Sequence, residues 1–216
     1  MRAGYEPPSW DVDTLPATPL AAFAGWLADA VAAAVAEPNA MVLGTADEHG
    51  RPSARTVLLK RIDGRGFVFF TNHRSHKGRE LAANPQASLV FPWYAMGRQV
   101  VVAGSVELLP RSESDTYAVS RPRESQLAAW ASRQSSVLPD RATLEASYAD
   151  VAARYPEPEP VPVPDFWGGY LVRPRSVELW HGRPSRLHDR FRYRTAADRL
   201  ARLDDAAAWV VERLAP

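Results

Sequence analysis

The chain has 216 residues, 46% of them hydrophobic, and its 26 Lys and Arg against 25 Asp and Glu give a net charge of +1. This balance argues against bulk nucleic-acid binding, and the lack of cysteine excludes disulfides, thiolate zinc sites and cysteine nucleophiles. We find neither a signal peptide nor an apolar run long enough to cross a membrane, so we expect a soluble, cytoplasmic protein. Arginine dominates the basic residues, because lysine occurs only at Lys60 and Lys77.

The first part of the chain predicts an arm, a helix and an antiparallel meander. Residues 1–17 are rich in Pro and Asp and predict an irregular N-terminal arm, and we expect residues 18–216 to form one domain. The pair Thr18-Pro19 is typical of a helix start, and apolar residues keep helical spacing from 20 to about 37. Three strands joined by Gly-containing turns are predicted next, over 41–45, 53–59 and 67–71.

The remaining pattern alternates between helices and strands. A short helix is predicted over 75–83, and the region 112–154 is helical in pattern with breaks at Arg121-Pro122 and Leu138-Pro139. Prolines at every second position make 156–164 an extended crossover. Further strands are predicted over 87–93, 99–109, 167–172, 176–180, 191–195 and 209–214. The fold class that follows is mainly β with α (α+β), a β-barrel with helices packed around it.

Two basic runs exceed what such a barrel needs. In the run 55–60, the odd spacing of Arg55 and Lys60 puts them on opposite faces of an extended strand. The run 71–77 follows a strand and opens a helix with hydroxyl and basic side chains, which favours an anion site. A solvent-exposed edge strand would also explain the first run, and an N-capped surface helix the second.

Two further runs mix arginine with hydrogen-bonding side chains. Arg, Ser and Gln alternate over 120–126 and 132–136, a mixture that suits a phosphate monoester, although a pair of surface helices would show similar residues. The run 180–191 gathers two histidines and three arginines beside a tryptophan, which favours a functional role. No nucleophile, acid–base pair or metal-binding spacing stands out, so we expect a bound cofactor to carry the chemistry and no metal.

In these runs the sequence resembles the pyridoxine/pyridoxamine 5′-phosphate oxidase family over essentially the whole chain. The matching segments are RTVLLK at 55–60, FFTNHRSHK at 69–77, FPW at 91–93, RQV at 98–100, SRPRESQLAAWASRQSS at 120–136, FWGGY at 166–170 and ELWHGRPSRLHDRF at 178–191. The resemblance implies an FMN-binding split β-barrel surrounded by helices, with a C-terminal dimerisation region. It also implies a homodimer with FMN at the subunit interface, without nucleic acid or membrane as a partner.

The resemblance also assigns residues to the cofactor and to the substrate. The implied cofactor-binding residues are Arg55, Thr56, Val57, Leu58, Leu59, Lys60, Phe70, Thr71, His76, Lys77, Gln99, Gln134, Ser135, Trp180 and Arg190. The implied substrate-binding residues are Lys60, Tyr117, Arg121, Ser125, Arg186 and His188, with Arg2 and Tyr5 in an arm that can close as a lid. Arg186 and His188 would be the catalytic residues and cover the pyridine ring. In the family an arginine usually stands at the position of His76, and a neutral imidazole offers fewer donors to a phosphate.

The implied activity is oxidation of pyridoxine or pyridoxamine 5′-phosphate to pyridoxal 5′-phosphate. A hydride would pass from substrate C4′ to flavin N5, and O2 would reoxidise the flavin with release of H2O2, and of NH3 when the substrate is the amine. Two alternatives remain open. One is a related FMN oxidase of secondary metabolism, of the phenazine type, and the other is a non-catalytic flavin- or pyridoxal-phosphate-binding protein.

Overall fold

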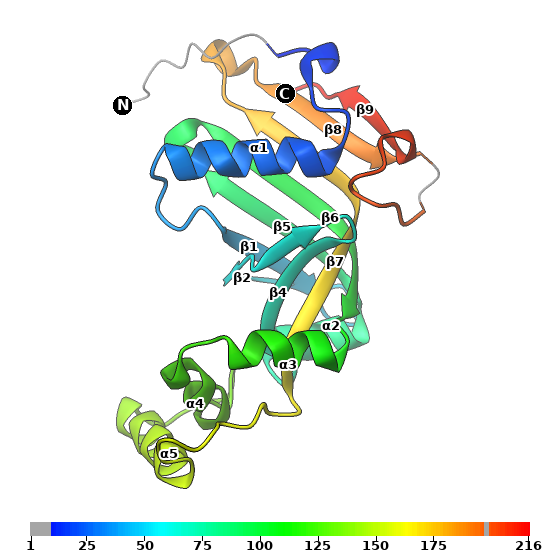
Figure 1. Cartoon of the computed structure of the whole chain (residues 1–216). Helices are drawn as coiled ribbons and strands as arrows, with labels where there is room; N and C mark the ends of the chain where they lie inside the picture. The colour runs from blue at the N-terminus through cyan, green and yellow to red at the C-terminus, as the bar shows by residue number, and fades with distance from the viewer. Residues whose placement is uncertain (1–9, 197–198) are drawn as a thin grey trace.

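The computed structural model describes residues 10–196 and 199–216, and there nine antiparallel strands form one sheet (Figure 1). The strand order is β2-β1-β5-β6-β7-β4-β3, and β8 pairs with β7 and β9 with β8. The strands are β1 (Ala40–Ala46), β2 (Pro52–Leu58), β3 (Arg61–Asp63), β4 (Gly66–Asn72), β5 (Gln86–Trp93), β6 (Arg98–Leu108), β7 (Trp167–His181), β8 (Asp189–Thr195) and β9 (Trp209–Arg213). β2 and β3 are the first and last strands of this order, yet only Leu59 and Lys60 separate them along the chain. The sheet therefore curls back on itself. At this closure the Lys60 N–H donates to the Val68 carbonyl at 2.8 Å.

The helices gather at the two ends of the curled sheet. They are α1 (Pro19–Ala32), α2 (His76–Ala83), α3 (Arg111–Val119), α4 (Arg123–Ala131) and α5 (Arg141–Arg154). In Figure 1, α1 lies across the sheet at one end, whereas α3, α4 and α5 are grouped at the other. This arrangement confirms the predicted α+β split barrel. None of the described helices is long and apolar enough to cross a membrane.

Helix α1 begins as predicted but ends earlier. Thr18 caps its N-terminus, because the Thr18 hydroxyl accepts a hydrogen bond from the Ala21 N–H at 3.2 Å. The predicted end near residue 37 is wrong, since Ala34 adopts a left-handed φ of 52°. The Val35 N–H then donates to the Ala30 carbonyl at 3.0 Å, which closes the helix with a Schellman motif.

The two strands predicted over 167–172 and 176–180 are one continuous strand, β7. Pro174 lies in the middle of this strand, although a proline has no N–H for a ladder hydrogen bond. In the structure it lies at an irregularity where the β6–β7 register shifts between Ala103 and Gly104. A Cβ on Gly104 would lie 2.1 Å from the Arg173 carbonyl oxygen, so only glycine fits this close approach. The bulge therefore lets β7 continue past its proline.

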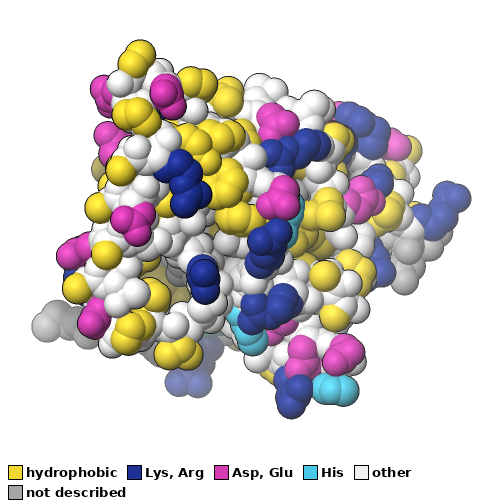
Figure 2. Space-filling model, turned by 90° about the horizontal axis from the view of Figure 1, so that it is seen from below, with side chains coloured by type: hydrophobic (Ala, Val, Ile, Leu, Met, Phe, Trp, Pro, Cys, Tyr) yellow, Lys and Arg dark blue, Asp and Glu magenta, His cyan; other side chains and the backbone are white. Residues whose placement is uncertain are grey.

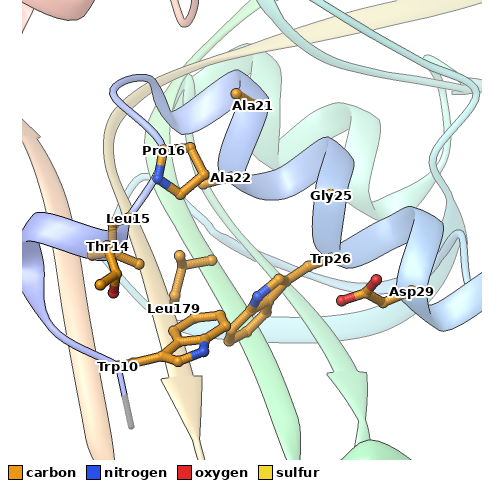
Figure 3. A pocket seen from close by; sticks show the side chains of 10 residues that line it. All are labelled: Trp10, Thr14, Leu15, Pro16, Ala21, Ala22, Gly25, Trp26, Asp29 and Leu179. Carbon is orange, nitrogen blue, oxygen red and sulfur yellow. The ribbon is translucent and has the colours of Figure 1, made fainter. Parts of the chain in front are cut away.

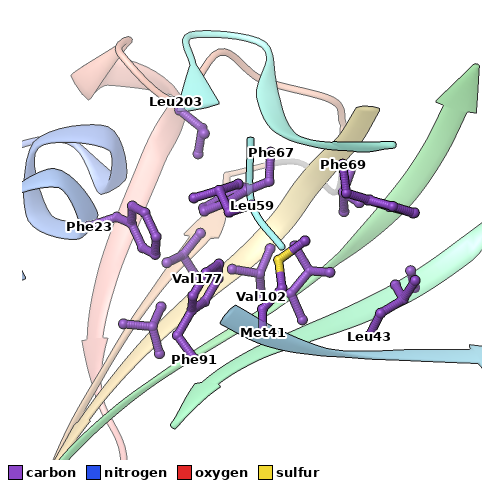
Figure 4. Close-up of a cluster of buried hydrophobic side chains, with 14 of the residues drawn as sticks. Phe23, Met41, Leu43, Leu59, Phe67, Phe69, Phe91, Val102, Val177 and Leu203 are labelled. Carbon is purple, nitrogen blue, oxygen red and sulfur yellow. The ribbon is translucent and has the colours of Figure 1, made fainter. Parts of the chain in front are cut away.

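The core fills the space between α1 and the concave face of the sheet (Figure 4). Phe23 of α1 is fully buried. Its ring lies edge-on to Phe67 of β4 and Phe91 of β5, with centroids 4.9 and 4.8 Å apart. Such edge-to-face aromatic pairs add to the stabilisation from burial, so Phe23 contributes strongly to the packing of the helix on the barrel.

Replacing this ring tests how far the fold depends on α1. We expect Phe23→Ala to lower the free energy of unfolding by about 3 to 5 kcal/mol, because the lost ring leaves a cavity. Val31→Ala is the control on the same helix, since Val31 is 61% exposed, and it should change stability by about 0.5 kcal/mol or less. Urea denaturation measures both, and equal losses in the two variants would contradict this account of the core.

Candidate active site

A buried lysine at the start of α2 joins three segments of the chain. Ser75 caps the helix by accepting a hydrogen bond from the Gly78 N–H at 3.2 Å, which fixes the first turn. Lys77, only 8% exposed, donates from Nζ to Gln134 Oε1 at 2.8 Å and to Thr71 Oγ1 at 3.3 Å. The Thr71 hydroxyl also donates to Gln134 Oε1, at 3.1 Å. Three predicted cofactor ligands thus meet here from β4, α2 and the segment after α4.

The charge of Lys77 is not balanced by an acidic partner. Among the described residues, no carboxylate lies within ion-pair distance of its ammonium, whose hydrogen-bond partners are neutral oxygens. Burial, and then the nearby positive charge of Arg55, lower the pKa of Lys77. Because Glu80 pairs with Arg55, the three groups together leave one net positive charge, carried on a buried ammonium with neutral hydrogen-bond partners, and this favours a bound anion.

Arg55 is engaged by a buried carboxylate that the sequence reasoning missed. Glu80 of α2 is 5% exposed, and its Oε2 lies 3.2 Å from Arg55 Nη2. It also accepts hydrogen bonds from the hydroxyls of Thr45, at 2.5 Å, and Ser53, at 2.7 Å. Burial opposes ionisation of Glu80, but the Thr45 and Ser53 hydroxyls and neighbouring charges outweigh it and lower its pKa. His76 Nε2 lies 3.0 Å from Glu80 Oε1, so the exposed imidazole faces this carboxylate.

A stack of aromatic rings stands beside the lysine cluster. The rings of Phe70 and Tyr117 are 4.0 Å apart and nearly parallel, and Trp167 continues the stack, 5.5 Å from Phe70. The Arg121 guanidinium lies 4.6 Å above the Trp167 ring. Burial lowers the pKa of Arg121, which still remains charged at neutral pH, and within the described part of the chain no carboxylate pairs with it. Ser125 lies on the first turn of α4, where its N–H donates to the Pro122 carbonyl at 2.9 Å.

The other predicted residues gather at the far end of β7. Trp180 of β7 is paired with Gln99 on β6 and with Arg190 on β8. The His188 ring lies 4.7 Å from the Trp180 ring. Arg186 is exposed on the loop between β7 and β8. Arg190 makes a two-pronged ion pair with Glu178, at 2.8 and 3.1 Å, which raises the pKa of the arginine.

One chain therefore holds the predicted residues in two separate groups. The first group lies beside Gly168, which pairs with Thr71, and the second surrounds Trp180 on the same strand. At about 3.3 Å per residue, these positions are roughly 40 Å apart along the strand. Figure 2 shows the end of the molecule that carries α3 to α5, where Lys and Arg side chains form a band across the middle of the face.

The residues predicted over 55–60 are unequal in accessibility. Val57 and Leu59 pack in or against the hydrophobic core, Leu58 is half-buried, and Thr56 is exposed. Lys60 is exposed and follows the end of β2, so the expected alternation with Arg55 along one strand does not apply to it.

The last predicted positions lie in loops or outside the described part. Ser135 has a left-handed φ of 71° and follows Gln134 directly. Arg2 and Tyr5 lie outside the described residues.

Glu80 and Trp167 were absent from the predicted set, and each had a weak signal in the sequence. Glu80 is four residues after His76, the spacing of neighbours on a helix face. Trp167 belongs to the FWGGY segment, which was matched to the family without a role for the ring.

A separate pocket of about 330 Å³ lies between the arm and α1 (Figure 3). The indoles of Trp10 and Trp26, whose centroids are 4.8 Å apart, form one side of it. The Arg98 guanidinium lies over both rings and pairs with Asp29 at 2.6 Å. The aromatic faces therefore already contact a cation of the protein itself. None of the predicted site residues lines this pocket, which is distinct from the two polar groups.

Comparison with known proteins agrees with the fold and with the matched segments. A family model described as pyridoxamine 5′-phosphate oxidase matches residues 27–155, and one described as pyridoxine 5′-phosphate oxidase C-terminal dimerisation region matches 167–216. A pyridoxine/pyridoxamine 5′-phosphate oxidase from Salinispora arenicola is 58% identical over 90% of this chain and 84% of its own length. One from Ralstonia pickettii is 52% identical over 100% of this chain and 97% of its own length.

A solved structure adds a second kind of relative. PhzG from Burkholderia lata 383, solved in complex with tetrahydrophenazine-1-carboxylic acid, has a TM-score of 0.86 and 33% identity, covering 99% of this chain and 100% of that one. The first family model alone spans more than half of the chain, and the relatives named above are more than half identical to it. This chain therefore belongs to the pyridoxamine 5′-phosphate oxidase family.

Proposed function

We propose that this protein is an FMN-dependent oxidase that converts pyridoxine 5′-phosphate or pyridoxamine 5′-phosphate to pyridoxal 5′-phosphate. O2 is the electron acceptor, H2O2 is released, and the amine substrate also yields NH3. The observation that carries the proposal is the presence of two half-buried or buried cations, Lys77 and Arg121, that lack acidic partners in the described residues. A phosphorylated cofactor and a phosphorylated substrate would each supply one missing anion.

The lysine cluster suits the phosphate and the sugar-alcohol chain of FMN. Lys77 and Arg55 supply positive charge, while Thr71, Gln134 and Ser135 supply polar groups for the hydroxyls and the phosphate. The chemistry that FMN supplies when bound is acceptance of a hydride and return of the electrons to O2. The protein's own task is then to hold the substrate and to exclude other reactions.

The second arginine site suits the substrate phosphate. Arg121 rests on the Trp167 ring, so its guanidinium is oriented without an acidic partner that would compete with a phosphate. Tyr117 and Ser125 offer hydroxyls nearby, and Lys60 adds an exposed ammonium at the closure of the sheet. Binding the phosphate at one end fixes the reacting carbon at the other, which lowers the entropic cost of reaching the transition state.

A complete site would need residues from both ends of β7, which lie roughly 40 Å apart along the strand in one chain. A homodimer would bring the Trp180, Arg186 and His188 end of one chain to the Lys77 end of its partner. The match of residues 167–216 to a dimerisation region supports this arrangement. The arm over residues 1–17 would act as the lid, and the cytoplasmic location stays a prediction.

Product formation separates this proposal from its alternatives. The FMN-loaded protein is incubated in air with pyridoxine 5′-phosphate, pyridoxamine 5′-phosphate or unphosphorylated pyridoxine, and aldehyde absorbance and H2O2 are followed. We expect product from the phosphorylated compounds and little from pyridoxine. No product from either phosphorylated compound would refute the proposal. Turnover of tetrahydrophenazine-1-carboxylic acid instead would favour the phenazine-type oxidase, and flavin binding without any turnover would favour the binding protein.

Arg121→Ala should weaken substrate binding more than it changes the chemical step. Because a charge-assisted hydrogen bond contributes about 1.5 to 3 kcal/mol, we expect KM for the phosphorylated substrate to rise roughly 10- to 100-fold with little change in kcat or in bound flavin. Arg141→Ala is the control, since Arg141 is exposed on α5 and pairs only with Glu145 at 2.6 Å among described residues. Steady-state kinetics measure both variants, and an unchanged KM in Arg121→Ala would remove this residue from the substrate site.

Lys77→Met should weaken FMN binding without unfolding the protein. The variant removes a buried charge that has no acidic partner, so the flavin-free protein should keep its melting temperature or gain a little. The Kd for FMN, measured by quenching of flavin fluorescence, should rise about 10-fold or more. Arg79→Met, at an exposed position two residues along the same helix, is the control. Equal FMN affinity in the two variants would exclude Lys77 as a phosphate ligand.

A further inference from the structure

The loop between β7 and β8, residues 182–188, adopts a strained backbone. Ser185 and Arg186 have left-handed φ angles of 57° and 63°, which residues other than glycine rarely adopt. The Leu187 N–H donates to the Pro184 carbonyl at 3.2 Å and closes the turn. Strain of this kind persists only where surrounding contacts hold it in place. The contacts at the base of the loop therefore have to be strong.

Asp189 provides these contacts as a buried carboxylate at the first position of β8. It is 8% exposed, and its Oδ2 accepts from Arg183 Nε at 2.6 Å while its Oδ1 accepts from Arg213 Nη1 at 3.0 Å. Arg183 is the second residue of the loop and Asp189 directly follows it, so this ion pair ties the two ends of the loop together. Arg213, the last residue of β9, also donates to the Trp10 carbonyl at 2.6 Å. One carboxylate thus links the loop, β9 and the arm.

The same ties fix the ring of His188. The Arg183 N–H donates to His188 Nδ1 at 3.0 Å, and the imidazole lies 4.7 Å from the Trp180 ring. Because Nδ1 accepts a hydrogen bond, the neutral ring carries its proton on Nε2. His188 therefore presents an Nε2–H donor on its other side. Arg183 sets this tautomer with its backbone and reaches Asp189 with its side chain.

We propose that Asp189 is a positioning residue for the oxidase reaction. By holding Arg183 against Arg213, its carboxylate fixes the loop backbone, the tautomer and orientation of His188, and the direction of Arg186. Asp189 acts through these residues and makes no contact with the substrate itself. The catalytic consequence depends on the proposed function, whereas the state of the His188 ring is a property of the chain alone.

A second carboxylate with the same type of contacts offers a matched control. Glu212 of β9 bridges Arg192 and Arg194 of β8, at 2.8 and 2.5 Å. Its arginine partners both lie outside the 182–188 loop. Glu212→Gln and Asp189→Asn each remove one charge from a carboxylate that bridges two arginines. Asp189 is the more buried of the two, with 11% of its side chain exposed against 29% for Glu212, and only its bridge supports the loop.

Kinetics of the FMN-loaded variants test the catalytic part. We expect Asp189→Asn to lower kcat roughly 10- to 100-fold, since displacement of a catalytic group by about 1 Å has effects of this size. KM for the phosphorylated substrate and the Kd for FMN should stay close to those of the unmodified protein, because the residues at the phosphates are untouched. Glu212→Gln should retain kcat. An equal loss of kcat in both variants would show a general structural role and overturn the proposal.

The ¹⁵N NMR signals of the histidine rings in the flavin-free protein test the geometric part. His188 should give the Nε2–H tautomer pattern in the unmodified protein and in Glu212→Gln, and an averaged pattern in Asp189→Asn. An unchanged pattern together with an unchanged kcat in Asp189→Asn would refute the proposed positioning role of Asp189. If this variant does not fold, Arg213→Gln removes the other half of the bridge and is measured in the same way. Inactivity of the unmodified protein would refute the proposed function. The NMR comparison would then test by itself whether Asp189 fixes the His188 ring.

Discussion

The single strand β7 is the constraint on which the rest of the structure depends. It pairs with β6 along its length on one side, and on the other side first with β4 and then with β8. The change of neighbour coincides with a bulge at Pro174, where β6 approaches so closely that Gly104 has no room for a Cβ, and bulges bend the strand that carries them. The bulge thus joins the curled barrel to the β8–β9 extension.

The bend also determines how the functional residues are divided. The first half of β7 pairs with β4 and lies near α2 and α3. The loop that carries Arg186 and His188 follows the second half of the strand. Along β7 the two groups lie roughly 40 Å apart, which is farther than one side chain can reach. Under the proposed function, two chains would assemble to complete the site, and local supports such as Glu80 and Asp189 would hold each half of it in place.

Local signals in the sequence predicted most helices and strands. Contacts between segments that are distant in the chain could not be predicted from such signals. The Thr18 cap, the Gly-containing turns and the proline breaks around α4 act over a few residues, and these elements formed where they were expected. The division of β7 into two predicted strands was wrong, because the bulge beside Pro174 that lets the strand continue depends on its pairing with the distant β6. In the same way, the bond between Lys77 and Gln134 joins residues 57 positions apart, and no spacing rule connects them. The family resemblance supplied the predicted site residues, whereas the contacts of Glu80 and Asp189 were visible only in the structure.

The surroundings of Lys77 give a physical reason why lysine, scarce elsewhere in the chain, is used at this position. Arginine supplies planar donors that match a carboxylate, as in the two-pronged pair of Arg190 with Glu178. The oxygens of Thr71 and Gln134 around Lys77 Nζ belong to different segments of the chain. A compact ammonium can donate to several such oxygens from one buried point, whereas a guanidinium would need more room and a flat partner. A chain that otherwise uses arginine for nearly every cation therefore has a structural reason to keep lysine at this position.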